Sequence, residues 1–187
     1  SKHDRILVGW DEIIEGGLPS GATVMSWRGI EGGWEASKEG HDVVMTPNTV
    51  YLNQYQGEPD YEPIAFGGYV PLKNVYAFDP VVDSMSLQQK KHILGSQANL
   101  WSEFVTNESE SEYMLYPRLA ALSEALWTPK EKKDWGRFSE KVPALFERFD
   151  ALDINYSRSA YAVTALSDLN NDGKVDALDL DTFEAGS

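Results

Sequence analysis

The chain has 187 residues, of which 42% are hydrophobic, and its 30 acidic and 16 basic side chains leave a net charge of −14. This composition supports a folded core and argues against nucleic acid or an anionic membrane as a partner. Cysteine is absent, which excludes disulfides and thiolate metal sites, and no apolar run approaches the roughly 20 residues of a membrane span.

Short strand-like runs alternate with helix-like segments along most of the chain. Strands are expected at 6–8, 23–26, 42–46 and 93–101, a helical turn at 12–15, and helices at 33–39, 109–127 and 130–151. Ser109 and Glu112 would form the capping box of the helix at 109–127. Such alternation predicts an α/β fold with a parallel sheet built from four βα units. A complete eight-unit barrel takes about 250 residues, so the pattern predicts half of one.

The stretch 48–86 is rich in Pro, Gly and Tyr and has little periodicity. We expect a long loop with at most a short helix, and long ordered loops usually carry function.

Three of the strand-like runs end in a tryptophan, namely Trp10, Trp27 and Trp101. Glu103 follows Trp101 by two positions, so on an extended chain both side chains point to the same face. An indole offers an apolar wall to a sugar ring, and a carboxylate accepts hydrogen bonds from its hydroxyls. The pattern predicts an aromatic sugar-binding cage at one face of the sheet, with packing in the core as the alternative.

Several other side chains have simpler interpretations. Trp34, Trp127 and Trp135 fall in helical patterns and are expected to pack internally, and Arg28 and Arg118 are expected to form structural ion pairs.

The composition changes near residue 161, which divides the chain into regions 1–160 and 161–187. Segment 168–179 carries oxygen ligands at loop positions 1, 3, 5, 9 and 12 with a glycine at position 6, the ligand spacing of a helix-loop-helix calcium site. The expected ligands, including the main-chain carbonyl at position 7, belong to Asp168, Asn170, Asp172, Lys174, Asp176 and Asp179.

Six motifs in the first region resemble a known family. They are GWDEI (9–13), VMSWRG (24–29), DVVMTP (42–47), YLN (51–53), GSQANLWSE (95–103) and YPRLAALSEALW (116–127). Together they look like the C-terminal half of the catalytic domain of family 20 glycoside hydrolases, the β-N-acetylhexosaminidases. The tail from Ser167 resembles one repeat of a type I dockerin, the calcium-binding module that docks enzymes onto cohesin scaffolds.

The resemblance implies a (β/α)8 barrel that removes terminal β-linked N-acetylglucosamine or N-acetylgalactosamine from glycans. The reaction would be retaining and substrate-assisted, because the acetamido oxygen of the substrate itself attacks the anomeric carbon. It needs no cofactor for catalysis, so calcium would serve only the C-terminal loop. The parent protein would be secreted or attached to a bacterial cell surface.

The resemblance also assigns site residues. An apolar box of Trp10, Trp27 and Trp101 would enclose the acetamido group, and Tyr51 would be catalytic by hydrogen-bonding its oxygen. Glu103 would bind ring hydroxyls. Asn53 stands where the family usually has an aspartate that contacts the sugar, so a charge is lost there. Tyr69 or Tyr76 would replace the tryptophan with which some members contact the next sugar.

The family's catalytic Asp-Glu pair follows a His-x-Gly-Gly-type motif that this sequence lacks. Asp11 and Glu12 fall on the loop of another strand, where adjacent side chains point in opposite directions, so at most one would face the sugar. We therefore expect a hexosaminidase parent and an inactive isolated chain. The alternatives are a non-catalytic carbohydrate-binding relic and a calcium-dependent scaffold-docking fragment.

Overall fold

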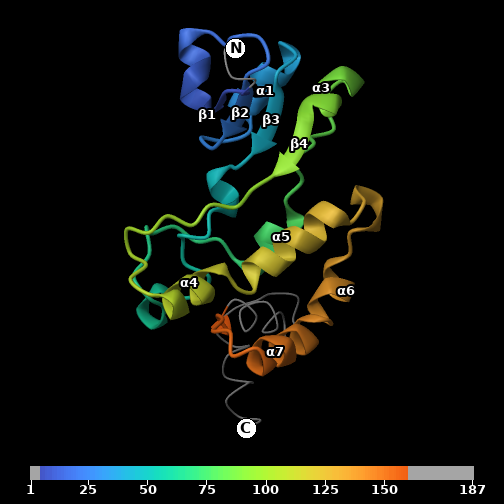
Figure 1. Ribbon diagram of the computed structural model, residues 1–187. Helices are drawn as coiled ribbons and strands as arrows, with labels where there is room; N and C mark the ends of the chain where they lie inside the picture. The colour runs from blue at the N-terminus through green and yellow to red at the C-terminus, as the bar shows by residue number, and fades with distance from the viewer. Residues whose placement is uncertain (1–4, 160–187) are drawn as a thin grey trace.

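The computed structural model describes residues 5–159, which form an α/β fold around one parallel sheet (Figure 1). The strands are β1 (Val8–Trp10), β2 (Thr23–Ser26), β3 (Asp42–Met45) and β4 (Ile93–Ser96), in that order across the sheet. Every neighbouring pair is parallel, and the pairing of β3 with β4 is interrupted by an irregularity between Val43 and Val44. The predicted parallel sheet is therefore confirmed, and its closure into a barrel stays a prediction.

Helical segments connect and follow the strands. The α-helices are α1 (Glu31–Lys38), α2 (Leu72–Ala77), α3 (Leu87–His92), α4 (Glu108–Leu115), α5 (Arg118–Trp127), α6 (Trp135–Ser139) and α7 (Val142–Ala151). Short 3-10 helices are η1 (Asp11–Gly16), η2 (Asn48–Val50), η3 (Pro59–Tyr61) and η4 (Lys130–Lys132). Within the described part of the chain no helix is long and apolar enough to cross a membrane.

Two stretches that were each predicted to form one helix form several shorter helices instead. The stretch 109–127 divides into α4 and α5 at the cis peptide bond between Tyr116 and Pro117. Proline lacks an N–H and disfavours helical backbone in the residue before it, and Tyr116 is extended. Asn107, rather than Ser109, caps α4, since its side chain accepts the Glu110 N–H at 2.9 Å.

The stretch 130–151 likewise divides into η4, α6 and α7. The carboxylate of Asp134 accepts the Arg137 N–H at 3.0 Å and so starts α6 as a separate helix. The last predicted strand is also shorter than expected, because β4 ends at Ser96 and residues 97–101 form a loop.

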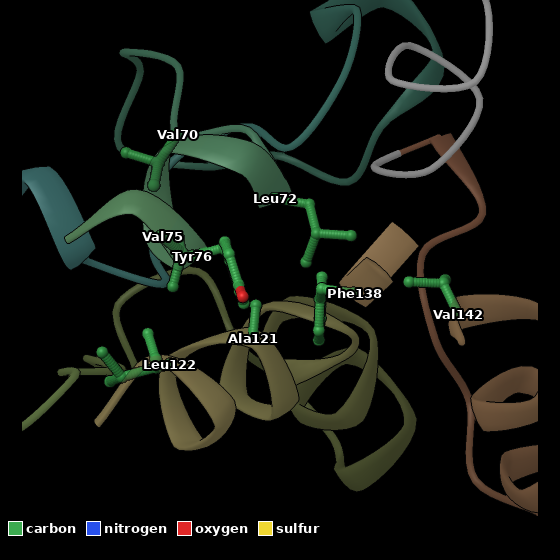
Figure 2. Close-up of a cluster of buried hydrophobic side chains, with 9 residues drawn as sticks. Val70, Leu72, Val75, Tyr76, Ala121, Leu122, Phe138 and Val142 are labelled. Carbon is green, nitrogen blue, oxygen red and sulfur yellow. The ribbon is translucent and has the colours of Figure 1, made fainter. Parts of the chain in front are cut away.

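The core consists of two apolar clusters. The first packs α1 against the sheet and contains Val24, Ala36, Val43, Met45 and Met85. The second lies among α2, α5, α6 and α7 (Figure 2) and contains Val70, Leu72, Val75, Tyr76, Ala121, Leu122, Ala125, Phe138 and Val142. Phe78 packs against both clusters and so joins the sheet to the helical layer.

Two of the three tryptophans that were expected to pack internally do so, and the third does not. Trp34 packs against the first cluster and Trp135 against the second, as predicted. The prediction for Trp127 is wrong, because this side chain ends α5 and is 89% exposed.

Arg118 is fully buried at the start of α5. Its guanidinium donates to the main-chain carbonyls of Leu52 at 2.6 Å, Met114 at 2.8 Å, Gln54 at 2.9 Å and Val70 at 3.3 Å. Burial lowers the pKa of Arg118 to about 9, so it remains a cation at neutral pH. The predicted ion pair is thus replaced by four carbonyl dipoles, which tie both ends of the segment 52–70 to the helical layer.

Gly33 allows α1 to approach the sheet closely. A Cβ at this position would lie 2.7 Å from Val43 Cγ1 and 2.9 Å from Met45 Sδ. Both neighbours are buried, and the β-branched valine has little rotamer freedom with which to move away.

We expect Gly33→Ala to lower the free energy of unfolding by roughly 1 kcal/mol, and Gly33→Val by more. Overpacking costs ~1–3 kcal/mol, which exceeds the gain of up to about 1 kcal/mol from removing a helical glycine. Chemical denaturation measures the difference. Gly16→Ala is the control, because a Cβ at Gly16 would meet no atom within 4 Å, and equal stability of the two alanine variants would contradict the packing argument.

Candidate functional site

A pocket of about 470 Å³ lies beyond the carboxyl ends of the strands. Trp10 is the last residue of β1, Trp27 directly follows β2, Tyr51 directly follows η2, and Trp101 lies in the loop after β4. The pocket is lined by Trp10, Glu12, Trp27, Tyr51, Phe66, Trp101 and Glu103. The structure therefore brings together five of the six residues that the sequence placed in a sugar site.

Two rings that come from the opposite ends of the sheet meet at this pocket. Trp10 and Trp101 have ring centroids 5.6 Å apart at an interplanar angle of 52°, although β1 and β4 are at opposite ends of the strand order. The loop after β4 must therefore return over the strand ends toward β1. Because Trp101 lies on a loop and is 39% exposed, something other than the sheet has to hold it.

Asn53 supplies that support. Its side-chain amide donates to the Trp101 carbonyl at 2.5 Å and accepts the Trp101 N–H at 2.6 Å. Asn53 is 2% exposed and does not line the pocket. Its two contacts need one donor and one acceptor, which an amide has and a carboxylate lacks. The structure thus gives Asn53 a supporting role, and a direct contact with sugar stays a prediction.

Tyr51 faces the pocket and is otherwise buried. Burial raises the pKa of its phenol, while the neighbouring side chains of Asn99 and Trp101 act in the opposite direction. With its pKa raised, the hydroxyl stays protonated at neutral pH and can donate a hydrogen bond. Asn99 is also buried, and its Nδ2 has no hydrogen-bond partner among the described residues. It lies beside Tyr51, in a position that the sequence did not single out.

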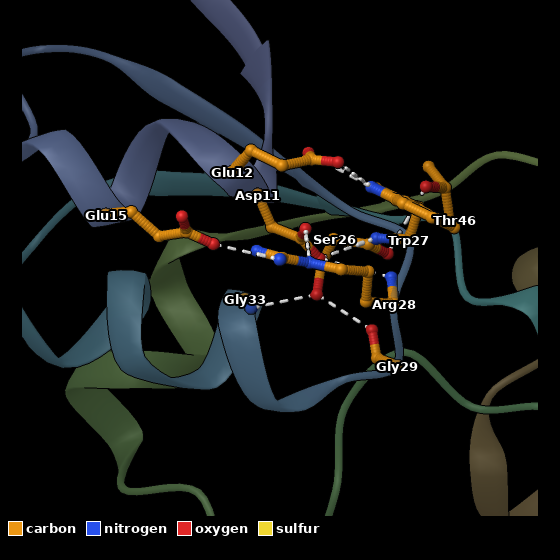
Figure 3. A network of polar contacts seen from close by, with 9 residues as sticks. All are labelled: Asp11, Glu12, Glu15, Ser26, Trp27, Arg28, Gly29, Gly33 and Thr46. Atoms are coloured by element: carbon orange, nitrogen blue, oxygen red, sulfur yellow. Dashed lines mark hydrogen bonds and ion pairs between the residues drawn. The ribbon is translucent and has the colours of Figure 1, made fainter.

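The adjacent carboxylates of η1 hold the residues that follow β2 (Figure 3). Asp11 accepts the main-chain N–H of Trp27 at 3.0 Å and of Arg28 at 3.2 Å, and it pairs with Arg28 Nε at 2.7 Å. Arg28 also pairs with Glu15 at 3.0 Å, so its predicted ion-pair role is confirmed.

Glu12 contacts the same tryptophan from the pocket side. Its two oxygens accept the indole N–H of Trp27 at 3.0 and 3.1 Å. The helical turn expected at 12–15 is confirmed as η1, which begins one residue earlier, at Asp11. Of the two adjacent carboxylates only Glu12 lines the pocket, whereas Asp11 is 2% exposed behind it.

Glu103 completes the polar part of the lining. Its side chain is exposed in the loop after β4, next to the tryptophan cage. Together with Glu12 it presents carboxylate oxygens to the pocket, and these oxygens can accept hydrogen bonds from hydroxyl groups of a ligand.

Phe66 is a pocket residue that the sequence did not reveal. It lines the pocket and packs edge-on against Phe104, with ring centroids 5.5 Å apart. Of the two residues expected to contact the next sugar, Tyr76 is excluded because it is stacked on Phe138 in the core. Tyr69 does not line this pocket, and its contact with a further sugar stays a prediction. The loop composition indicated a functional segment but gave no means of choosing among its aromatic residues.

Metal ligands are not gathered in the part of the chain that the structure describes. Residues 5–159 contain no group of three or more His, Asp or Glu side chains able to hold a metal ion. The predicted calcium loop at 168–179 lies outside the described residues.

Comparison with known proteins adds independent evidence. Residues 1–130 match the glycosyl hydrolase family 20 catalytic domain. A β-hexosaminidase of Porphyromonas gingivalis is 47% identical over 157 residues, which are 83% of this chain and 20% of that protein. A β-N-acetylhexosaminidase of Cellulomonas fimi is 30% identical over 73% of this chain and 28% of its own length.

Solved structures of family 20 enzymes are similar to this chain in fold. The crystal structure of a GH20 exo-β-N-acetylglucosaminidase from Vibrio harveyi in complex with N-acetylglucosamine has a TM-score of 0.71 and 29% identity. The alignment covers 81% of this chain and 24% of that one. A GH20 β-N-acetylhexosaminidase from Streptomyces coelicolor has a TM-score of 0.75 at 24% identity and shows the same fold. The chain therefore spans roughly a fifth to a third of these proteins.

We expect Asn53→Ala to lower the free energy of unfolding by about 1–3 kcal/mol, since it leaves the Trp101 N–H and carbonyl without their buried partners. Asn53→Asp should also destabilise, because a carboxylate oxygen would face the Trp101 carbonyl. Thermal unfolding followed by tryptophan fluorescence measures both. The control is Asn74→Ala on the exposed side of α2, and a wild-type transition for both Asn53 variants would argue against the supporting role.

Proposed function

Because the chain belongs to glycosyl hydrolase family 20, we propose that it supplies the sugar pocket of a β-N-acetylhexosaminidase. Such an enzyme removes terminal β-linked N-acetylglucosamine or N-acetylgalactosamine from chitin-derived or glycoprotein-derived glycans. The observation that carries the proposal is that Trp10, Trp27, Trp101, Tyr51 and Glu103 line one pocket.

The pocket suits the chemistry of substrate-assisted hydrolysis. In this mechanism the acetamido oxygen of the substrate attacks the anomeric carbon and takes the place of an enzyme nucleophile. Indole rings offer apolar walls for the acetamido methyl group, and Tyr51, kept protonated by its raised pKa, would donate to the acetamido oxygen. That hydrogen bond orients the oxygen for attack, and orientation lowers the barrier of an intramolecular reaction.

The remaining catalytic groups are assigned to a part of the protein outside this sequence. A general acid near neutral pH needs a raised pKa, whereas the pKa of Glu12 is lowered, first by its hydrogen bond from Trp27. We assign protonation of the leaving oxygen to an Asp-Glu pair on another strand of the same barrel. β1 and β4 are the outer strands of the described sheet, so further strands of that barrel would pair with their open edges.

A second proposal concerns the tail, which lies outside the described residues. We assign residues 161–187 to a dockerin-like repeat that binds one calcium ion through the loop at 168–179. The ligand spacing supports this assignment. The parent protein would then be secreted or held at a bacterial cell surface, where a cohesin scaffold is its candidate partner.

We expect the chain to bind N-acetylglucosamine more tightly than glucose, which lacks the acetamido group. Quenching of tryptophan fluorescence during titration measures both affinities. Tyr51→Phe should weaken binding of N-acetylglucosamine about five-fold, because a hydrogen bond contributes ~1 kcal/mol.

Tyr61→Phe is the control for that substitution, since Tyr61 is 86% exposed and outside the pocket lining. Equal affinity for the two sugars would contradict the acetamido pocket. Turnover of a chromogenic β-N-acetylglucosaminide by this chain, abolished in Glu12→Gln, would instead make Glu12 the acid and overturn the assignment of that step to another segment.

Calcium binding is tested by calorimetric titration of the chain with calcium chloride. We expect one ion per chain and loss of measurable binding in Asp172→Ala, which removes the ligand at loop position 5. Asp181→Ala removes the same charge from the tail outside the ligand set and should bind normally. Equal weakening by both variants would show non-specific attraction of calcium to an acidic tail.

A further inference from the structure

Trp27 is held at two points by two adjacent carboxylates. Asp11 accepts its main-chain N–H from the buried side, and Glu12 accepts its indole N–H from the pocket side (Figure 3). The first contact fixes the backbone from which the side chain leaves. The second acts at the far end of the ring, so the two contacts together define the plane of this pocket wall.

The ring needs such a contact because it stands after a strand and is only partly buried. A side chain in that position can adopt other rotamers unless packing or a hydrogen bond selects one. Both Glu12 oxygens share the single indole N–H, and a bond to an ionised acceptor is stronger than one between neutral groups. Glu12 is the second residue of the short turn η1. The side chains of the other two acidic residues in that turn, Asp11 and Glu15, pair with Arg28 and not with the indole.

We propose that Glu12 is a positioning residue that holds the indole of Trp27 in the orientation that forms the pocket wall. This role differs from that of general acid, the role considered above for Glu12 in hydrolysis. It concerns the same pocket as the proposed function, but it is a statement about the chain without ligand. Its test therefore needs no bound sugar and stands or falls independently of the proposed activity.

The contact responds to the charge on Glu12. The indole hydrogen bond, followed by a main-chain hydrogen bond and the nearby Arg28 cation, lowers the pKa of Glu12. The other ionisable groups around it are Asp11 and Glu15 in the same turn, and Tyr51 and Glu103 across the pocket. A lowered pKa means that the contact is complete above the usual range of a glutamic acid and weakens as the pH falls through the lowered value.

The experiment is NMR of the ¹⁵N-labelled chain, which has six tryptophans and hence six indole N–H signals. Trp27→Phe identifies the signal of Trp27. In the wild type we expect this signal to move as the pH is lowered through the titration of Glu12. Glu12→Ala should shift it at neutral pH toward the position of an indole bonded to water. Glu12→Gln keeps an acceptor oxygen, so it should restore much of the shift while abolishing the acid titration.

Glu15→Ala is the matched control, because it removes a carboxylate from the same turn without touching Trp27. It should leave the Trp27 signal and its titration in place. The proposal is overturned if Glu12→Ala leaves the Trp27 signal unmoved, or if Glu15→Ala moves it equally. It is also overturned if the acid titration of the signal persists in Glu12→Gln.

Discussion

The position of Trp101 in the pocket depends on hydrogen bonds made by the buried guanidinium of Arg118. The guanidinium holds the carbonyls of Leu52 and Gln54, one on each side of Asn53. Asn53 in turn holds both main-chain groups of Trp101, and Trp101 meets Trp10 from the opposite end of the sheet. Arg118 forms no ion pair among the described residues, although the charge of Glu62 acts against the effect of burial on its pKa. A buried cation of this kind needs fixed dipoles around it. The backbone conformation at Leu52 and Gln54 therefore depends on Arg118, and Arg118 can be buried only because these carbonyls are held in place.

On the opposite side of the pocket a buried anion, and not a cation, holds the backbone. There the buried carboxylate of Asp11 is compensated by two main-chain N–H groups and by Arg28. In both places a charged side chain organises backbone, and the backbone then presents an aromatic ring. The strands themselves are only three or four residues long, so polar contacts beyond their ends determine where the rings lie.

The lining of the pocket combines aromatic walls with carboxylates. Trp10, Trp27, Trp101 and Phe66 provide the apolar surface, and Glu12 and Glu103 provide exposed carboxylate oxygens that can accept hydrogen bonds. A neutral sugar with many hydroxyl groups matches such a surface better than an anion would, since the chain carries a net charge of −14. The acidic composition and the pocket thus favour the same class of ligand.

The sequence by itself determined the parallel α/β fold, the strand-end tryptophans and the inclusion of Tyr51 and Glu103 in the site. The fold and the tryptophans follow from apolar runs and turn residues along the chain, and Glu103 follows from its spacing of two from Trp101. Tyr51 was included through the resemblance of its motif to the family. Tertiary structure alone decided the roles of Asn53, Arg118, Glu12 and Phe66. Asn53 and Trp101 are 48 positions apart, and Arg118 and Leu52 are 66 apart. Whether a polar side chain faces a ligand or a distant carbonyl depends on which segments fold against it, and no local pattern records that choice.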